Sequence, residues 1–303
     1  IRYRLFLGPC KIGNRRPDPN DRGAMKTKTL IDGLCFGEGP RWHKDRLWFS
    51  DMHDHKVYAA DLDGNMETMA HVPQRPSGLG WLPDGRLLIV SMMDRKLLVL
   101  EDGELSEFSD IDALSKFDCN DIVVDQQGRS YVGNFGFDLH NNADQDTTEI
   151  VMVQPDGKAE VAATDMAFPN GTVITPDDKT MIVGETMAGC LTAFDINADG
   201  GLSNRRIWAQ LEGAIPDGIC LDEAGGIWVA SPISNEALRV EEGGDVTDRI
   251  AVENQAFACM LGGADRKRLF ILTSSTSHPD ECKTARSAKV EYVDVAVPGA
   301  SLP

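Results

Sequence analysis

A unit of two short apolar runs joined by a turn recurs along the chain about every forty residues. In its clearest copy, Asp217 and Gly218 precede the apolar run 219–221, and a turn at 223–226 leads into a second apolar run at 227–231. Two such runs around a glycine-rich turn predict a β-hairpin. Because self-similarity at a fixed period marks repeat architectures, this period favours a propeller over a sandwich or an open barrel.

Six copies of the unit occur, and each is followed by further β-type runs, so that a repeat supplies roughly four short strands. The residues that open the six copies are Glu38, Ser77, Asn120, Asn170, Asp217 and Ala258. A four-stranded blade cannot bury both of its faces alone, so the blades must pack radially. We therefore expect an all-β protein, a six-bladed β-propeller. The run 27–31 is placed to complete the last blade as its outer strand, which would close the ring into one domain over residues 25–303.

The first 24 residues stand apart from this pattern. They mix Arg, Pro, Asn and Asp without periodicity, and Met25 follows them. Their apolar piece, residues 5–7, is too short for the core of a signal peptide. We interpret residues 1–24 as a leader or vector-derived extension outside the fold, with a natural extension as the alternative.

The charge of the chain excludes some partners. A formal net charge of −18 repels phosphate backbones and anionic lipid head groups, so we expect neither nucleic acid nor a membrane as partner. The seven cysteines are scattered and form no Cys-x-x-Cys pair. That usage is typical of buried free thiols in a reducing compartment, and we expect a cytoplasmic protein.

The residue that opens each repeat gives the chemistry. In a propeller the innermost strands line the central channel, so the six equivalent positions converge on one axis. Four of them carry carboxylate or amide oxygens, namely Glu38, Asn120, Asn170 and Asp217. Two carboxylates at one axis repel each other unless a cation lies between them, and hard cations prefer oxygen ligands. We therefore predict a divalent metal site in the central channel, with Ca²⁺ as the first choice and Mg²⁺, Mn²⁺ or Zn²⁺ as alternatives.

A competing interpretation is that Asp217-Gly218 and Asn170-Gly171 are ordinary turn pairs. Their position argues otherwise. The pairs at 84–85 and 156–157 fall between strands, where hairpin turns belong, whereas Asn170 and Asp217 precede the first strand of a repeat. Glu38 is a poor turn residue and stands at the same position, which favours the metal site.

Four motifs in these positions resemble a known family. They are Gly37-Glu38-Gly39-Pro40-Arg41-Trp42, Cys119-Asn120-Asp121, Phe168-Pro169-Asn170-Gly171 and Pro216-Asp217-Gly218. In this order they resemble the senescence marker protein/gluconolactonase family, which includes regucalcin and bacterial sugar lactonases and is related to diisopropyl fluorophosphatase. The resemblance extends over about residues 27–293.

The resemblance implies a six-bladed propeller with one catalytic divalent metal. It assigns Glu38, Asn170 and Asp217 as metal ligands, and Asn120 as a ligand of the metal or of the substrate. Asp118 stands where animal-type members carry an arginine that contacts substrate hydroxyls. The reaction type is therefore better supported than a polyhydroxylated substrate.

The function we expect is that of a metal-dependent lactonase or esterase, which opens a lactone with a metal-polarised carbonyl and an activated water. Asp217 would be the catalytic residue, as general base or as nucleophile. Asn120, Asp118, Glu185 and Phe137 are the candidate substrate-binding residues, with Phe137 in an insertion, residues 135–148, that could overhang the channel as a lid.

Two alternatives remain open: an organophosphate or aryl ester hydrolase of the same fold, and a non-catalytic calcium-binding propeller. The expected partner is a small lactone or ester, and the expected state is a monomer or a small homo-oligomer. The histidines at 53, 55, 71 and 140 stand in polar surroundings and are expected at the solvated surface. No Gly-x-Ser-x-Gly motif supports a serine nucleophile.

Overall fold

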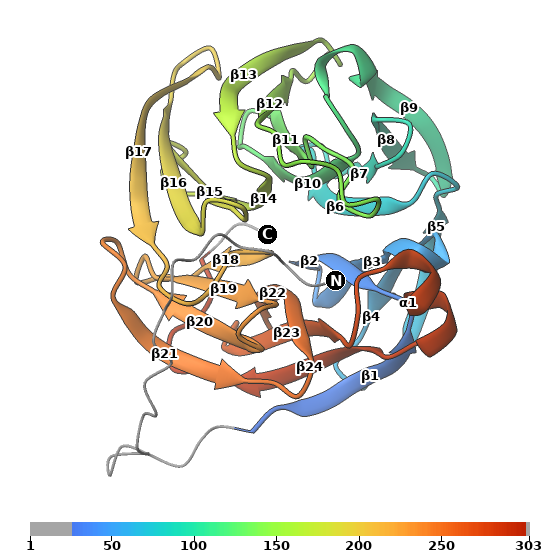
Figure 1. Ribbon diagram of the computed structural model, residues 1–303. Helices are drawn as coiled ribbons and strands as arrows, with labels where there is room; N and C mark the ends of the chain where they lie inside the picture. The colour runs from blue at the N-terminus through green and yellow to red at the C-terminus, as the bar shows by residue number, and fades with distance from the viewer. Residues whose placement is uncertain (1–25, 301–303) are drawn as a thin grey trace.

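Six four-stranded antiparallel sheets surround a central axis in residues 26–300, the part of the chain that this computed structural model describes (Figure 1). Each sheet is one blade, and the six-bladed β-propeller expected from the repeats is confirmed. The predicted leader, residues 1–24, lies outside the described residues.

Blades one to three follow the order of the chain from the axis outward. Blade one contains β2 (Gly37–His43), β3 (Arg46–Asp51), β4 (Lys56–Ala60) and β5 (Met66–His71). Blade two contains β6 (Pro76–Trp81), β7 (Leu87–Ser91), β8 (Lys96–Glu101) and β9 (Glu104–Asp110). Blade three contains β10 (Cys119–Val124), β11 (Ser130–Asn134), β12 (Thr148–Val153) and β13 (Ala159–Met166).

Blades four to six continue the ring. Blade four contains β14 (Pro169–Ile174), β15 (Thr180–Glu185), β16 (Cys190–Ile196) and β17 (Leu202–Gln210), and blade five contains β18 (Ile219–Leu221), β19 (Ile227–Ser231), β20 (Glu236–Val240) and β21 (Val246–Ala251). Blade six contains β22 (Gln255–Gly262), β23 (Arg268–Ser274), β24 (Ala288–Asp294) and β1 (Lys28–Leu34). Short helices occur at η1 (Met52–Asp54), η2 (Asp112–Leu114) and α1 (Pro279–Ala285).

The N-terminal strand closes the ring. β1 pairs antiparallel with β24, so the outer strand of the last blade comes from the start of the described chain, as the sequence predicted (Figure 1). Thr27 adds a side-chain hydrogen bond of 2.9 Å to Glu291 across the same junction. Closure leaves each blade with two neighbours, which removes the exposed sheet faces of an open array.

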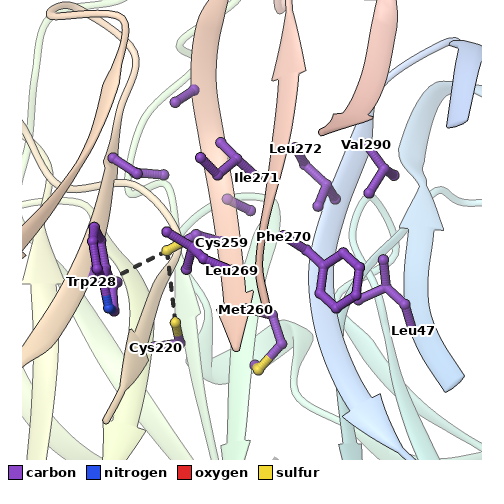
Figure 2. Packing of buried hydrophobic residues seen from close by; sticks show 14 of the residues in the cluster. Leu47, Cys220, Trp228, Cys259, Met260, Leu269, Phe270, Ile271, Leu272 and Val290 are labelled. Atoms are coloured by element: carbon purple, nitrogen blue, oxygen red, sulfur yellow. Dashed lines mark hydrogen bonds between the residues drawn. The ribbon is translucent and has the colours of Figure 1, made fainter. Parts of the chain in front are cut away.

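Apolar clusters fill the interfaces between neighbouring blades. The innermost strands are almost wholly buried, as in β6 and β10, whereas the outer strands β9 and β21 are mostly exposed. Figure 2 shows the largest of these clusters, where Trp228 of blade five, Phe270 of blade six and Leu47 of blade one meet. Burying one side chain such as Phe270 stabilises the fold by roughly 1.5–3 kcal/mol.

Hairpin turns are closed by aspartate side chains. Asp84 accepts a hydrogen bond of 3.1 Å from the backbone N–H of Arg86, and Asp156 accepts one of 3.0 Å from that of Lys158. These carboxylates satisfy turn N–H groups locally, as turn aspartates do. The Asp-Gly pairs between strands are therefore structural, which is the contrast with Asp217 that the sequence suggested.

Neighbouring inner strands touch through the glycines that follow the candidate ligands. The N–H of Gly171 donates to the carbonyl of Asp217 at 3.1 Å, and the N–H of Gly218 donates to that of Phe257 at 2.7 Å, so blades four, five and six are hydrogen-bonded at the axis. A Cβ at Gly171 would lie 2.4 Å from the backbone nitrogen of Ile219. Glycine is thus required for close backbone approach, and neither pair is a hairpin turn.

The pairing of the inner strands shifts register at this same level. In β2, β6, β10 and β14 the shift falls within residues 38–41, 76–79, 119–122 and 169–172, and in β22 it falls within 256–258. A bulge of this kind bends a strand and re-aims a side chain. The repeated irregularity therefore separates the first residues of each inner strand from the regular ladder that follows.

The far end of the channel is covered by the C-terminal segment. Gly299 forms a β-bridge with Asp222, and the N–H of Ala300 donates to the carbonyl of Leu221 at 2.9 Å. A pocket there, of about 520 Å³, is lined mainly by apolar residues from the later part of the inner strands. Among the helices of residues 26–300, none has the length and apolarity needed to cross a membrane.

The close packing at the axis predicts a specific sensitivity at Gly218. Its substitution by alanine would place a Cβ 2.7 Å from the Cα of Ala258, which requires a backbone shift. We expect Gly218→Ala to lower the free energy of unfolding by about 1–3 kcal/mol in chemical denaturation. Gly201→Ala is the control, because its nearest atom is a side-chain oxygen of Asp199 at 3.2 Å. Equal stability of the two variants would contradict this account.

Candidate functional site

The four predicted oxygen ligands meet at one pocket. It encloses about 540 Å³, its open mouth included, and its wall contains Glu38, Asn120, Asn170 and Asp217. They come from blades one, three, four and five, each at the start of an inner strand or just before it. Asn120, Asn170 and Asp217 are buried, and Glu38 is half-buried. Residues more than one hundred positions apart are therefore assembled by the repeat itself.

The rest of the wall is mostly aromatic and apolar, and it comes from segments that connect the strands at this end of the channel. The lining residues not predicted from the sequence are Phe36, Met52, His53, Phe135, Leu139, His140, Phe168, Thr186, Pro232, Phe257 and Ser277. Phe135, Leu139 and His140 belong to the insertion 135–148, which therefore contributes part of the pocket wall.

The two carboxylates are held in an environment that resists their ionisation. Burial, and then the negative charge of Asp217, raise the pKa of the Glu38 carboxyl well above its usual range. Burial also raises the pKa of Asp217 to about 8, against an opposing hydrogen bond from Asn170. Desolvation favours the neutral form of each acid, and a cation between them would favour the charged form.

A buried ion pair lies next to the ligands in the channel. Arg41 of β2 and Asp121 of β10 are 3.0 Å apart, and both side chains are at most one-tenth exposed. Arg41 also donates to the carbonyl of Ile122 at 2.6 Å. Because Arg41 is engaged by Asp121, and the charge of Asp121 raises the pKa of Asp217, this pair does not neutralise the site.

Each amide is oriented by a hydroxyl group. Thr186 donates its proton to the carbonyl of Pro216 at 2.8 Å, so its oxygen is free to accept the amide N–H of Asn170 at 3.2 Å. That contact assigns the nitrogen of Asn170 and leaves its carbonyl oxygen for another partner. Ser77 donates to the Oδ1 of Asn120 at 3.3 Å. Such outer contacts orient the ligands of metal sites.

This donor set fits a hard divalent cation. It supplies two carboxylates with raised pKa values and two oriented amide groups, and all four side chains offer oxygen atoms as ligands. Within residues 26–300, no three His, Cys, Asp or Glu side chains form a group suited to a metal ion, so a metal here would depend on the amides. A soft-metal cluster of thiolates and imidazoles does not fit this part of the molecule.

Two predicted substrate-binding residues lie behind the wall. Asp118 is half-buried, and its carbonyl accepts the N–H of Phe135 at 3.0 Å, so its backbone anchors the start of the insertion. Phe137 is buried in the apolar cluster beneath the insertion and packs edge-on against Phe168 at 6.1 Å. Neither side chain belongs to the pocket wall.

Glu185 does not reach the pocket rim, contrary to the expectation. Its carboxylate accepts hydrogen bonds from the N–H of Ala167 at 2.8 Å and from Arg205 at 2.9 and 3.1 Å. Side chains alternate between the two faces of a strand, and the pocket is lined by the next residue, Thr186. The same one-residue displacement holds in blade six, where Phe257 and not Ala258 lines the pocket.

The surface assignment of two histidines was wrong. His53 is 2% exposed, and His140 is half-buried, and both line the pocket. His55 and His71 are half-buried and exposed, respectively. The polar residues around 53 suggested solvent, but η1 buries Met52 and His53, and both line the pocket. Neighbouring Asp54 and His55 are the more exposed members, so local composition could not separate them.

Comparison with known proteins identifies a family. A family model described as the SMP-30/Gluconolactonase/LRE-like region matches residues 36–275. Similar curated proteins include a pentonolactonase of Haloferax volcanii, 26% identical over 91% of this chain and 96% of that protein. They also include a 6-deoxy-6-sulfogluconolactonase of Pseudomonas putida, 26% identical over 88% and 94%, and a regucalcin of Danio rerio, 26% identical over 78% and 82%.

Solved structures share the fold. A calcium-binding regucalcin from Agrobacterium tumefaciens superposes with a TM-score of 0.76 at 21% identity, covering 92% of this chain and 97% of the other. A gluconolactonase from Xanthomonas campestris has a TM-score of 0.72 at 24% identity, covering 91% and 90%. At these identities the agreement concerns the propeller alone.

The raised pKa of Asp217 predicts how stability without metal depends on pH. The folded carboxyl has a pKa of about 8 against an ordinary 3.8, so the folded state binds its proton more tightly than the unfolded state. The resulting stabilisation is fully present below pH 3.8, is lost progressively as pH rises towards about 8, and changes no further above that. His53, whose pKa burial lowers to about 3, has the opposite effect, but only below its ordinary value of 6.5.

In chelator, we therefore expect the free energy of unfolding to fall between pH 6.5 and about 8, by at most roughly 1.4 kcal/mol per pH unit for one proton, and to level off at higher pH. Asp217→Asn should flatten this slope, and so should saturating Ca²⁺, because a cation favours the charged carboxylates. Denaturant titrations at several pH values measure it. A slope that is unchanged in Asp217→Asn would assign it to other groups.

The hydroxyl that orients Asn170 yields a second prediction. Thr186→Val removes the acceptor of the Asn170 amide and the donor to Pro216 without changing side-chain shape. We expect divalent-ion affinity, measured by calorimetry, to fall about 10–100-fold. Thr192→Val is the matched control, since Thr192 is equally buried and donates to Glu185 away from the pocket. Equal losses in both variants would mean that Thr186 acts only through stability.

Proposed function

The chain belongs to the SMP-30/gluconolactonase/LRE-like family, and from that premise we propose that it is a metal-dependent hydrolase that opens lactones. The observation that carries the proposal is the convergence of Glu38, Asn120, Asn170 and Asp217 on one pocket from four separate blades. The names of the similar pentonolactonase and sulfogluconolactonase support the reaction class.

Glu38, Asn120, Asn170 and Asp217 would hold one divalent ion, with Ca²⁺ as the first candidate. When bound, such an ion acts as a Lewis acid toward a carbonyl oxygen and stabilises negative charge that develops there. The calcium-binding description of the regucalcin structure agrees with this choice of metal for that protein. The proposed site would favour ions that prefer oxygen ligands, because none of the four residues supplies a thiolate or an imidazole.

Asp217 is the proposed general base. Its carboxylate accepts a proton from a water molecule as the water oxygen bonds to the lactone carbonyl carbon. The ring C–O bond then breaks, and the proton passes to the ring oxygen, which leaves as the hydroxyl group of a hydroxy acid. Asn170 keeps the Asp217 carboxylate in position through its amide, as the hydrogen bond that lowers the pKa of Asp217 indicates.

The aromatic wall serves the same reaction. Phe36, Phe135, Phe168 and Phe257 line the pocket and exclude bulk water from one side of it. A partly dry pocket strengthens electrostatic interactions at the reacting carbonyl. Part of this wall belongs to the insertion 135–148, which makes that segment the proposed determinant of substrate choice.

We place the enzyme in the cytoplasm as a monomer or small homo-oligomer acting on a small-molecule substrate. The six cysteines of the described residues are free and buried, as expected for a reducing compartment. The strongly acidic chain is a poor partner for nucleic acid or anionic membranes.

A second candidate is a non-catalytic calcium-binding propeller, which the similarity to regucalcins favours. A third is an organophosphate or aryl ester hydrolase, since one electrophile-activating site can serve several acyl or phosphoryl groups. A panel of aldonolactones, aliphatic lactones, aryl esters and phosphotriesters separates the three. Ion binding without turnover of any of them would favour the non-catalytic candidate.

The decisive test combines metal depletion with two substitutions. We expect chelation to abolish lactone hydrolysis and added divalent ion to restore it. Asp217→Asn should lower kcat by about 10²–10⁴-fold, the usual contribution of a general base, and Glu38→Gln should weaken ion binding in calorimetry. Asp156→Asn makes the same change in an Asp-Gly pair that serves a hairpin turn, so it should leave kcat unchanged. Full activity of Asp217→Asn would refute its role.

A further inference from the structure

His53 is a buried histidine that the proposed reaction does not use. It lies in η1, directly after β3, and lines the same pocket as the four oxygen ligands. His53 is 2% exposed, and its ring packs against Phe36 with ring centroids 5.3 Å apart. A polar ring kept within an aromatic wall needs hydrogen-bond partners, because an unpaired buried group costs about 1–3 kcal/mol.

Only one of the two ring nitrogens has a partner among the described residues. Nε2 lies 3.3 Å from the carbonyl oxygen of Ser277, and a carbonyl can only accept, so Nε2 carries the proton. Nδ1 is buried and has no hydrogen-bond partner among residues 26–300. Burial and the charge of Arg75 lower the pKa of His53 to about 3, so the ring is neutral at neutral pH. Nδ1 is therefore an unpaired acceptor on a side chain that lines the pocket.

We propose that His53 is a substrate-positioning residue whose Nδ1 accepts a hydrogen bond from a hydroxyl group of the ligand bound over the oxygen ring. The identity of that ligand as a lactone rests on the proposed function, whereas the acceptor itself does not. His53 would thus favour ligands that carry a ring hydroxyl over unsubstituted ligands of the same ring size.

The surroundings favour a neutral hydroxyl as the donor. The side chains of Phe36, Phe135 and Phe168 in the same wall cannot donate to Nδ1. The nearby positive charge of Arg75, which lowers the pKa of His53, disfavours an ammonium donor. His140 provides a second buried Nδ1 without a partner in the described chain, and it comes from the insertion 135–148. Two residues that line one pocket thus each have a buried ring nitrogen without a hydrogen-bond partner in residues 26–300.

The test uses two substitutions that separate the two nitrogens. A glutamine amide reaches the position of Nε2, so His53→Gln can keep the hydrogen bond to Ser277 but leaves nothing at Nδ1. An asparagine amide reaches the position of Nδ1, so His53→Asn keeps an acceptor there and gives up the bond to Ser277. If His53 has only a structural role, His53→Gln should be the milder substitution. If Nδ1 accepts a hydrogen bond from the ligand, His53→Asn should retain more of the ligand affinity.

The probes are 1,5-anhydroglucitol, a ring polyol that cannot be hydrolysed, and tetrahydropyran, the same ring without hydroxyl groups. Binding is followed by NMR titration of the Ca²⁺-loaded protein. We expect His53→Gln to weaken polyol binding roughly tenfold, the equivalent of one neutral hydrogen bond, and to leave tetrahydropyran binding unchanged. His53→Asn should retain most of the polyol affinity. The ¹⁵N resonance of Nδ1 in the unsubstituted protein should shift with polyol and not with tetrahydropyran.

His55→Gln is the matched control, because His55 bonds to the carbonyl of Pro73 at 2.9 Å and lies outside the pocket wall. The proposal is overturned if the unsubstituted protein does not prefer the polyol, if His53→Gln binds it as tightly, or if the Nδ1 resonance does not move. Selective polyol binding without turnover of any lactone would refute the proposed function and leave this inference standing. Turnover without that selectivity would do the reverse.

Discussion

The close approach of neighbouring inner strands at the axis is the constraint on which the site depends. At Gly171 and Gly218 the backbones of adjacent blades are in contact and hydrogen-bonded, with no room for a side chain. The residue before each glycine, Asn170 or Asp217, must then present its side chain to the pocket and not to the neighbouring strand. The same close approach of the strands thus determines both their packing and the placement of the candidate ligands. The register shift in β14 falls within residues 169–172, the segment that contains Asn170 and Gly171.

That condition explains why the sequence predicted the fold and the convergence of the candidate ligands together. The turn pairs between apolar runs revealed the repeat. The number of repeats then predicted six blades, and the apolar run before the first repeat predicted that β1 completes the last blade. Because the candidate ligands occupy equivalent positions, aligning the repeats was sufficient to predict that Glu38, Asn120, Asn170 and Asp217 lie close together, and all four line one pocket. The pocket wall does not follow the repeat. It is built by connecting segments of different lengths, so Phe36, His53 and Phe135 had no periodic signal to reveal them.

The errors were displacements of one or a few residues, and they have a common physical cause. Side chains alternate along a strand, so an uncertainty of one position exchanges Glu185 for Thr186 and Ala258 for Phe257. Glu185 also illustrates that an acidic residue near a pocket can be paired within its own blade, here by hydrogen bonds from Arg205. Burial of His53 depended on the direction in which η1 leaves its strand, which local composition does not encode. The Arg41–Asp121 pair was likewise invisible, since its members are 80 residues apart.

The closure of the ring by β1 also has a kinetic meaning. Its hydrogen-bonded partners lie about 260 residues further along the chain, as the contact of Thr27 with Glu291, 264 residues apart, illustrates. Contacts of such high contact order form late in folding, and during synthesis they cannot form until β24 has left the ribosome. Blade six packs between blade five and blade one, so its completion fixes the separation of Asp217 and Glu38 at the axis. A cation that binds between these residues would therefore bind the closed ring more tightly than the open chain. By mass action, such an ion would stabilise the closed ring.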